Sequence, residues 1–256
     1  MSSMDIHNSQ PKRNLIMACH ITGVFDVNRN ETLQDDSYEL VRDWAESIAK
    51  QNLHGIIFHN NFSAETCQKY ENDYISFVRV EYNAAFNPNV FRYFVYRDFV
   101  EKNMDLFNNI FVTDISDVTL MKNPFSEAFF KENPQSIFCG DEPKILNNEW
   151  MNEHSTHLRN NLPDYADYEK SFGDETLLNC GIIGANAPLF FQFIQQLCAI
   201  HERGNRENKT AFTGDMGAFN YLVRTKFNEN LKHGAPVNTV FKGYENERQD
   251  CWFRHK

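Results

Sequence analysis

Apolar runs typical of buried strands alternate with segments of helical spacing through the first half of this 256-residue chain. The runs that favour strands are 13–25, 53–61, 75–82 and 109–114. The segments that favour helices are 36–52, with Ser37 as a candidate N-cap, 63–73 and 87–103. Because strands separated by helices pair mainly in parallel, this order predicts an α/β fold: a mostly parallel central sheet with helices on both faces.

The second half of the chain is less regular. A strand is expected at 176–185, a helix closed by Gly204 at 187–204, and a further helical segment at 213–227. The stretch 148–175 is polar, aromatic and rich in turn-forming residues. We interpret it as an excursion that faces the substrate.

Charge and hydropathy exclude several classes of protein. The formal net charge of −10 argues against a nucleic-acid or anionic-membrane partner, since such partners attract clustered Lys and Arg. No apolar run reaches the ~18 residues of a transmembrane segment, and the polar start at 1–12 is expected to be a disordered lead-in. The six cysteines have no C-x-x-C spacing, so free thiols in a reducing compartment are expected. A soluble, cytoplasmic protein is therefore predicted.

Two aspartates, Asp114 and Asp117, leave the apolar run 109–113 in the segment NIFVTDISDVTL. A capped turn explains such a pair, because Asp side chains bond to their own backbone in turns. A divalent-cation site explains it too, because hard cations prefer oxygen ligands and keep positions open for phosphate oxygens. In parallel sheets, ligands bind beyond the carboxyl ends of the strands, where this pair is expected. Both interpretations stay open at this point.

Four segments together resemble glycosyltransferases with the GT-A fold. FVTDISDVTLMKNPF is similar to their Asp-x-Asp region, in the variant where Asp-x-x-Asp-Val precedes Pro-Phe. LLNCGIIGANAPLFFQFI resembles the family's Asn-x-Gly strand and the helix after it, FTGDMGAFNYL the segment with an acid ahead of a helix, and CWFRHK the C-terminal metal-binding histidine. The four matches keep the family's order over 105–256, whereas 1–104 agree only in the order of strands and helices. The extra residue between the aspartates departs from the pattern and leaves open which carboxylate contacts the metal.

The resemblance implies one GT-A (Rossmann-like) catalytic domain over 13–256. Residues 13–125 would form its nucleotide-sugar-binding half and 126–256 its acceptor-binding half. It also implies a bound Mn²⁺ or Mg²⁺, with Asp117 as the principal ligand and Asp114 on the metal or on the nucleotide ribose. His255 would complete the ligand set through an imidazole nitrogen, which suits Mn²⁺ better than Ca²⁺. His233 is the competing histidine.

Donor-binding residues follow from the same resemblance. The backbone around Ile21 and Thr22 would seat the nucleotide base. Asn179 and Gly181 would line the donor and acceptor pocket, where a glycine lets a ligand approach the backbone closely.

Further charged residues are assigned to the donor and to catalysis. Arg92 would bind the donor sugar or diphosphate, because a guanidinium pairs with such groups through two hydrogen bonds. Arg97, five positions further along the same expected helix, cannot face the same point. Asp215, Asp141 and Glu175 are the candidate catalytic carboxylates.

The implied activity is metal-dependent transfer of a sugar from a nucleoside diphosphate sugar to a hydroxyl of a carbohydrate acceptor. A UDP-linked sugar is the expected donor, and the order of the motifs is more similar to that of retaining members. One alternative is a phosphohydrolase with Asp114 as nucleophile, although such enzymes normally carry the aspartate pair after the first strand. A second alternative is a non-catalytic carbohydrate-binding member of the fold.

Overall fold

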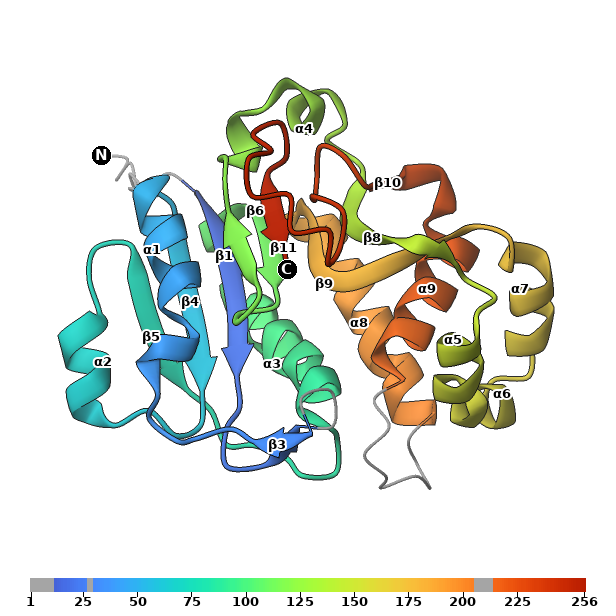
Figure 1. Ribbon diagram of the computed structural model, residues 1–256, viewed down its shortest axis with the longest axis horizontal. Helices are drawn as coiled ribbons and strands as arrows, with labels where there is room; N and C mark the ends of the chain where they lie inside the picture. Colours follow the sequence, from blue (N-terminus) through green and yellow to red (C-terminus); the bar gives the residue numbers. More distant parts are fainter. Residues whose placement is uncertain (1–11, 27–29, 205–213) are drawn as a thin grey trace, which may run out of the picture.

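The computed structural model describes residues 12–26, 30–204 and 214–256 (Figure 1). The expected lead-in therefore lies, apart from residue 12, outside the described residues. The chain forms a seven-stranded sheet in the order β10-β8-β9-β6-β1-β4-β5. Its strands are β1 Arg13–His20, β4 His54–His59, β5 Ile75–Arg79, β6 Phe107–Thr113, β8 Ile137–Ile145, β9 Thr176–Asn186 and β10 Leu231–His233.

Most neighbouring strands of this sheet run parallel, which confirms the α/β prediction. β9 is the exception, because it pairs antiparallel with both β6 and β8. Strands from both halves of the chain share the one sheet, since β9 from the second half lies next to β6 from the first. Two small sheets, β2–β3 and β7–β11, complete the strands; their members are β2 Phe25–Asp26, β3 Glu31–Thr32, β7 Val118–Leu120 and β11 Phe253–His255.

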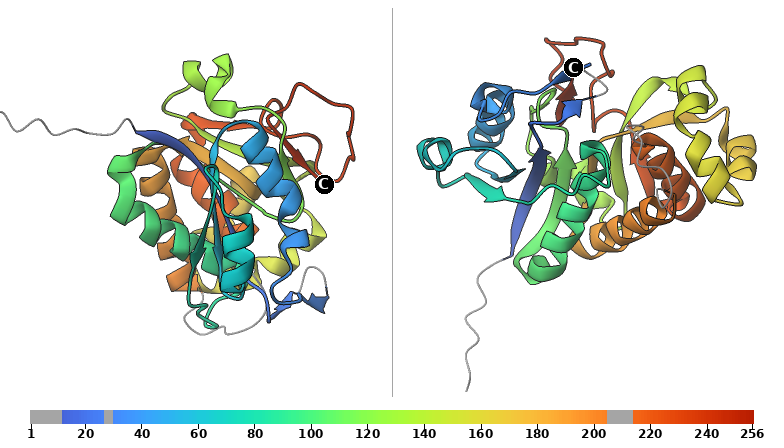
Figure 2. Two further views of the ribbon diagram at one scale, coloured as in Figure 1. Left: turned by 90° about the vertical axis from the view of Figure 1, so that its left-hand side faces the viewer. Right: turned by 90° about the horizontal axis from the view of Figure 1, so that it is seen from below.

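Helices cover both faces of the sheet (Figures 1 and 2). α1 packs on one face, and α3 and α8 lie side by side on the other. Helices α5, α6 and α7 pack around α8 and α9 at the far end. The bounds are α1 Arg42–Lys50, α2 Ala64–Tyr70, α3 Pro88–Asn103, α4 Ala128–Glu132, α5 Glu149–His154, α6 Thr156–Asn161, α7 Tyr165–Phe172, α8 Ala187–Gly204 and α9 Asp215–Lys226, with short 3-10 helices η1 Tyr38–Leu40, η2 Met104–Leu106, η3 Pro124–Ser126 and η4 Asn228–Asn230.

The central strands contribute side chains to two hydrophobic cores. On β1, Leu15 and Met17 belong to the core shared with α3 and α8, whereas Ile16 and Ala18 belong to the core shared with α1. Successive side chains of a strand point to opposite faces, so a strand buried on both sides reads as a continuous apolar run. That is why the run at the start of the chain was recognisable as a strand.

An aromatic cluster around Phe111 of β6 ties the C-terminal end of the chain to the sheet. The ring of Phe111 lies 5.2 Å from that of Phe253 and 6.2 Å from that of Trp252, measured between centroids. All three side chains are buried. The burial of large aromatic side chains is among the strongest contributions to core stability, so this cluster holds β11 in place.

Several expectations about local structure need correction. The helix expected at 36–52 is split into η1 and α1; Ser37 makes no capping hydrogen bond through its side chain, and α1 begins at Arg42. The stretch 148–175 contains three helices, α5 to α7, because its aromatic residues pack inward: Tyr165 and Tyr168 are buried. Strands β8 and β10 and the β7–β11 pair were not assigned from the sequence. Within the described ranges, no helix combines the length and the apolarity needed to cross a membrane.

We expect Gly184→Ala to destabilise the fold. A Cβ at this position of β9 would fall inside the van der Waals surface of the Phe111 ring, which neighbouring aromatic rings hold in place. Overpacking of this kind costs ~1–3 kcal/mol. Gly140→Ala is the matched control on β8, because its Cβ would lie 3.5 Å from the nearest atom. Chemical denaturation should show a loss for the first variant only, and equal stabilities would contradict the packing argument.

A buried histidine should make the fold sensitive to acid. Burial lowers the pKa of His201 from 6.5 to about 3, and neither ring nitrogen has a hydrogen-bond partner among the described residues. Between these two pKa values the unfolded chain binds a proton that the folded chain does not, so stability falls as the pH is lowered.

The expected contribution of His201 is a loss of about 2 kcal/mol between pH 7 and pH 5. His201→Phe keeps a ring that can stack on Tyr93, as His201 does now, and removes the titrating group. Denaturant unfolding at both pH values should show a smaller acid loss in this variant. An unchanged loss would mean that His201 is already protonated in the folded state.

Candidate metal and ligand site

Two sheets meet where Asp114 and Asp117 lie. Asp114 follows the last residue of β6, and its backbone N–H donates to the carbonyl of Gly181 on β9 (2.7 Å). Asp117 comes immediately before β7, which pairs antiparallel with β11 so that His255 lies opposite Val118. A further backbone bond joins Lys256 N–H to the carbonyl of Asp117 (2.9 Å). The penultimate residue of the chain is thereby fixed beside the aspartates.

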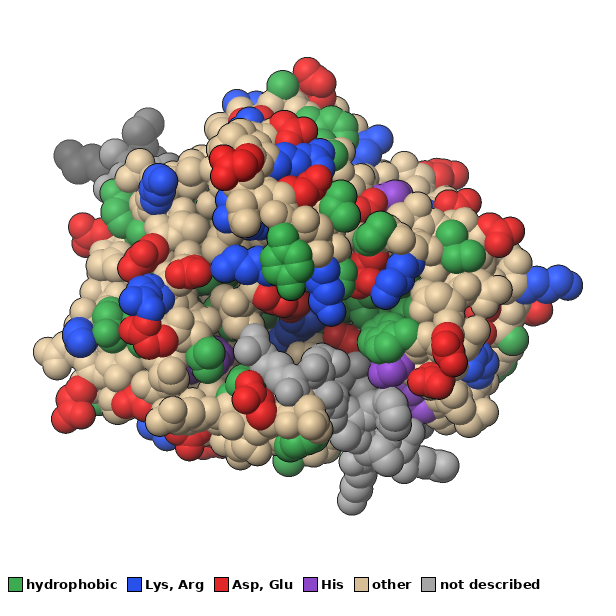
Figure 3. Space-filling view, viewed as in Figure 1, with side chains coloured by type: hydrophobic (Ala, Val, Ile, Leu, Met, Phe, Trp, Pro, Cys, Tyr) green, Lys and Arg blue, Asp and Glu red, His purple; other side chains and the backbone are tan. Residues whose placement is uncertain are grey.

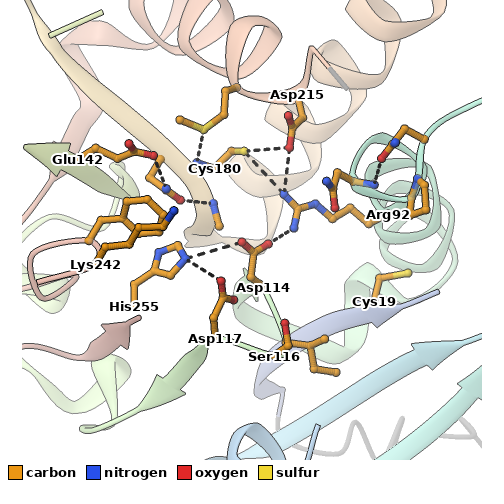
Figure 4. Close-up of a pocket in the computed structure, with 18 of the residues that line it drawn as sticks. Cys19, Arg92, Asp114, Ser116, Asp117, Glu142, Cys180, Asp215, Lys242 and His255 are labelled. Carbon is orange, nitrogen blue, oxygen red and sulfur yellow. Dashed lines mark hydrogen bonds and ion pairs between the residues drawn. The ribbon is translucent and has the colours of Figure 1, made fainter. Parts of the chain in front are cut away.

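The three side chains form a compact cluster of possible metal ligands (Figure 4). One ligand atom from each of Asp114, Asp117 and His255 lies within 4.8 Å of the other two. His255 Nε2 is 3.8 Å from Asp114 Oδ2 and 3.8 Å from Asp117 Oδ2. Two carboxylate oxygens and an imidazole nitrogen form a donor set that can bind a divalent cation.

The environment of His255 favours the neutral ring. The side chain is 1% exposed, and burial lowers the pKa of His255 although the charge of Asp114 acts in the opposite direction. Its Nδ1 is buried without a hydrogen-bond partner among the described residues, and its ring packs edge-on against Phe241. A neutral imidazole is the form that binds a metal. The competing histidine, His233, instead bonds to Asp141 through Nδ1 (2.9 Å).

Gly181 makes room for the cluster. A Cβ at this position would lie 2.6 Å from His255 Cε1 and equally close to the Asp114 carboxylate. The sequence predicts that a ligand approaches the backbone closely at Gly181. In the structure, the side chains of Asp114 and His255 make this close approach instead. Asn179 supports the same strand, since its Oδ1 accepts from Gly181 N–H (2.7 Å) and its Nδ2 donates to Glu142 (2.9 Å).

Arg92 of α3 contacts the cluster through Asp114. Its guanidinium pairs with Asp114 Oδ1 and lies 3.6 Å from Asp215 Oδ2, the first residue of α9. Burial opposes charge on Arg92, but the carboxylate of Asp114, together with Tyr93, Cys180 and Tyr96, outweighs it, and the pKa of Arg92 is raised well above its usual range. The arginine is thus a permanent cation bridging two carboxylates. Arg97 faces elsewhere and pairs with Glu202 (3.3 Å).

The cysteine beside this bridge is a thiol. Burial and the nearby charge of Asp215 raise the pKa of Cys180 well above its usual range. Its Sγ–H can therefore donate to Asp215 Oδ2 (3.5 Å). Asp215 has Arg92 and Cys180 as partners, and does not act as a helix N-cap: that position is held by Gly214.

These groups lie in a cavity of about 570 Å³ (Figure 3). Figure 3 shows a hollow with acidic and basic side chains at its floor. Eight of the residues singled out from the sequence line it: Ile21, Arg92, Asp114, Asp117, Asn179, Gly181, Asp215 and His255.

Other predicted site residues do not line this cavity. The backbone N–H and C=O of Thr22 are both bonded to the side chain of Asn60 (3.0 and 2.9 Å). Asp141 points to His233, and Glu175 is an exposed residue 3.8 Å from Arg224.

Several cavity residues were missed by the sequence analysis, among them Lys144 and Lys242. In the segment FCGDEPK, Asp141 and Glu142 are both candidates to bind donor or acceptor hydroxyls, with a surface turn as the alternative. Of these two neighbours on β8, Glu142 lines the cavity and Asp141 does not, because successive side chains of a strand point to opposite faces. Lys242 belongs to the loop before β11, where no periodic pattern marks it; its Nζ lies 5.2 Å from the centroid of the Phe241 ring.

Neither a scan of the chain against protein-family models nor a search of curated proteins finds a significant match.

We expect the cluster to bind Mn²⁺. Binding is measured by electron paramagnetic resonance, as a decrease in the signal of the free ion. Asp117→Asn replaces a charged carboxylate ligand with a neutral amide, and His255→Ala removes the imidazole nitrogen. They should weaken binding by at least the ~10–100-fold that loss of outer-shell partners costs in metal sites. His233→Ala is the matched control, because that ring bonds to Asp141 outside the cavity. Equal Mn²⁺ affinity in all four proteins would rule out the cluster as the metal site.

Proposed function

We propose that this protein is a metal-dependent glycosyltransferase of the GT-A type. It transfers a sugar from a nucleoside diphosphate sugar, with UDP as the expected nucleotide, to a hydroxyl of a carbohydrate acceptor. The observation that carries the proposal is the convergence of Asp114, Asp117 and His255 within 4.8 Å, on the floor of a cavity of about 570 Å³. The cluster lies beyond the carboxyl end of β6, where ligands bind in sheets of this kind.

The charges around the cluster favour a polyanionic ligand that arrives with a cation. Four carboxylates and three Lys or Arg side chains line the cavity: Asp114, Asp117, Glu142, Asp215, Arg92, Lys144 and Lys242. Without a cation, the acidic majority would repel a diphosphate. A divalent ion at the cluster would supply Lewis-acid stabilisation of the charge on the diphosphate leaving group.

The protein's own groups would then hold the donor. Lys242 lies on the cavity wall beside Phe241 and His255, from where its ammonium can reach a phosphate oxygen near the cluster. Arg92 is engaged by Asp114 and Asp215, so its proposed role changes from direct contact with the donor to orientation of these two carboxylates.

The partners of the remaining acids favour retention of configuration. An inverting enzyme needs a carboxylate that can take the acceptor's proton. In the cavity, Asp215 already bonds to Arg92 and Cys180, and Glu142 accepts from Asn179. A retaining route needs no separate general base. It is therefore compatible with the bonds that Asp215 and Glu142 already make to neighbouring side chains.

The deciding test measures thermal stability with nucleotides and nucleotide sugars, each with and without Mn²⁺. A ligand at 100 times its dissociation constant should add about 2.7 kcal/mol of stability. We expect a shift that requires both UDP and Mn²⁺ in the wild-type protein and disappears in Asp117→Asn. Asp105→Asn is the matched control: it is exposed on η2, at the end of β6 away from the cluster.

Other outcomes would redirect the proposal. No shift with any nucleotide would overturn it. A shift with sugars alone, independent of Mn²⁺, would indicate a carbohydrate-binding protein. Phosphate release from a phosphomonoester that depends on Asp114 would indicate a phosphohydrolase.

A further inference from the structure

One large aromatic side chain lines the cavity while remaining exposed to solvent. Trp150, at the start of α5, is 39% exposed, whereas Trp44 and Trp252 are 1% and 0% exposed. These are the three tryptophans of the chain. Leaving apolar ring surface in water is unfavourable, and an aromatic side chain kept exposed in a concave site points to a ligand that covers it.

The indole of Trp150 is held in position by packing against one of its faces. Its ring stacks on that of His154 one helical turn later, with centroids 4.0 Å apart and planes 20° from parallel. His154 Nδ1 also lies 2.7 Å from the carbonyl oxygen of Trp150. The helix start is fixed by Asn148, whose side chain accepts from Met151 N–H, and Met151 is buried. One face of the indole is thus covered by His154, and Trp150 is among the residues that line the cavity.

Two charged side chains that line the same cavity add polar groups to this surface. Lys144 is well exposed on β8, and its Nζ is 3.9 Å from Glu142 Oε2. Glu142 is linked to the metal cluster through Asn179, which bonds to both Glu142 and Gly181 N–H. A carboxylate and an ammonium in the same cavity as an aromatic ring can accept from and donate to the hydroxyls of a ligand whose C–H groups lie on the ring.

We propose that Trp150, with Glu142 and Lys144, forms the subsite for the acceptor, and that the acceptor presents a pyranose ring which stacks on the indole. The assignment rests on the proposed function. A nucleobase could stack on an indole as well. The cavity is also lined by apolar side chains of the first 40 residues, Ile21, Val24, Leu33 and Leu40, and these suit a base better. Sugar hydroxyls that bind Glu142 would lie close to the proposed metal ligands, because Asn179 bonds to both Glu142 and Gly181 N–H.

The exposure pattern provides a direct optical test. Since Trp44 and Trp252 are buried, quenching of tryptophan fluorescence by acrylamide should report mainly on Trp150. A set of methyl α- and β-glycosides of glucose, galactose, mannose and xylose is added, with and without UDP and Mn²⁺. We expect at least one glycoside to protect the wild-type protein from quenching. Trp150→Phe should remove the quenchable signal and identify its source.

Binding of the protecting glycoside is then measured by calorimetry in matched variants. Trp150→Ala should weaken it about two- to ten-fold, the range measured for aromatic stacking, and Trp150→Phe should restore part of the loss. Leu106→Ala, which truncates another exposed apolar side chain on η2, should bind like the wild-type protein.

The outcomes separate this inference from the proposed function. If UDP with Mn²⁺ binds but no glycoside protects Trp150, the acceptor subsite is wrong and the proposed function stands. If UDP alone protects Trp150, or Trp150→Ala weakens UDP binding without a glycoside, the indole belongs to the nucleotide and the inference is overturned. If a glycoside protects Trp150 while no nucleotide binds, the sugar subsite is supported and the glycosyltransferase proposal fails.

Discussion

The site depends on the pairing of β11 with β7. This short antiparallel contact brings His255, the penultimate residue, opposite Val118 and next to Asp117. Three residues of pairing would not hold by themselves, because a two-stranded ribbon is marginal in water. Its stability comes from Trp252 and Phe253, which are buried against Phe111 of the central sheet. The same short pairing therefore packs Trp252 and Phe253 into the hydrophobic core and places His255 beside Asp114 and Asp117, the candidate metal ligands.

Electrostatics around the cluster follow from burial. Arg92 enters from α3 with almost no exposed surface, and a buried charge needs partners, which Asp114 and Asp215 supply. One oxygen of Asp114 faces the arginine while the other faces His255. The guanidinium thus orients the carboxylate that is proposed to hold a metal. Gly181 allows this crowding, since any side chain there would occupy the space of the Asp114 carboxylate and the His255 ring.

The proposed donor and acceptor parts of the cavity are built from different strands of the sheet. Ends of β1 and β6 supply Ile21 and Asp114, and β8, β9 and α5 supply Glu142, Asn179 and Trp150. The switch from parallel to antiparallel pairing between β6 and β9 lies between these two groups. A ligand that spans both would contact residues from both halves of the chain, as a donor and an acceptor in one cavity must.

The sequence by itself determined the four parallel strands β1, β4, β5 and β6, the helices α2 and α3, and the place of the aspartates. Those signals are local: a strand buried on both faces is a continuous apolar run, and a parallel sheet presents its binding edge at the carboxyl ends of its strands. Only the tertiary structure placed His255 rather than His233 beside the aspartates, and Glu142 rather than its neighbour Asp141 on the cavity wall. It also placed Thr22 and Glu175 outside the cavity and Trp150 on its wall. These outcomes depend on contacts between segments far apart in the chain, such as β7 with β11, which the period of a local pattern does not encode.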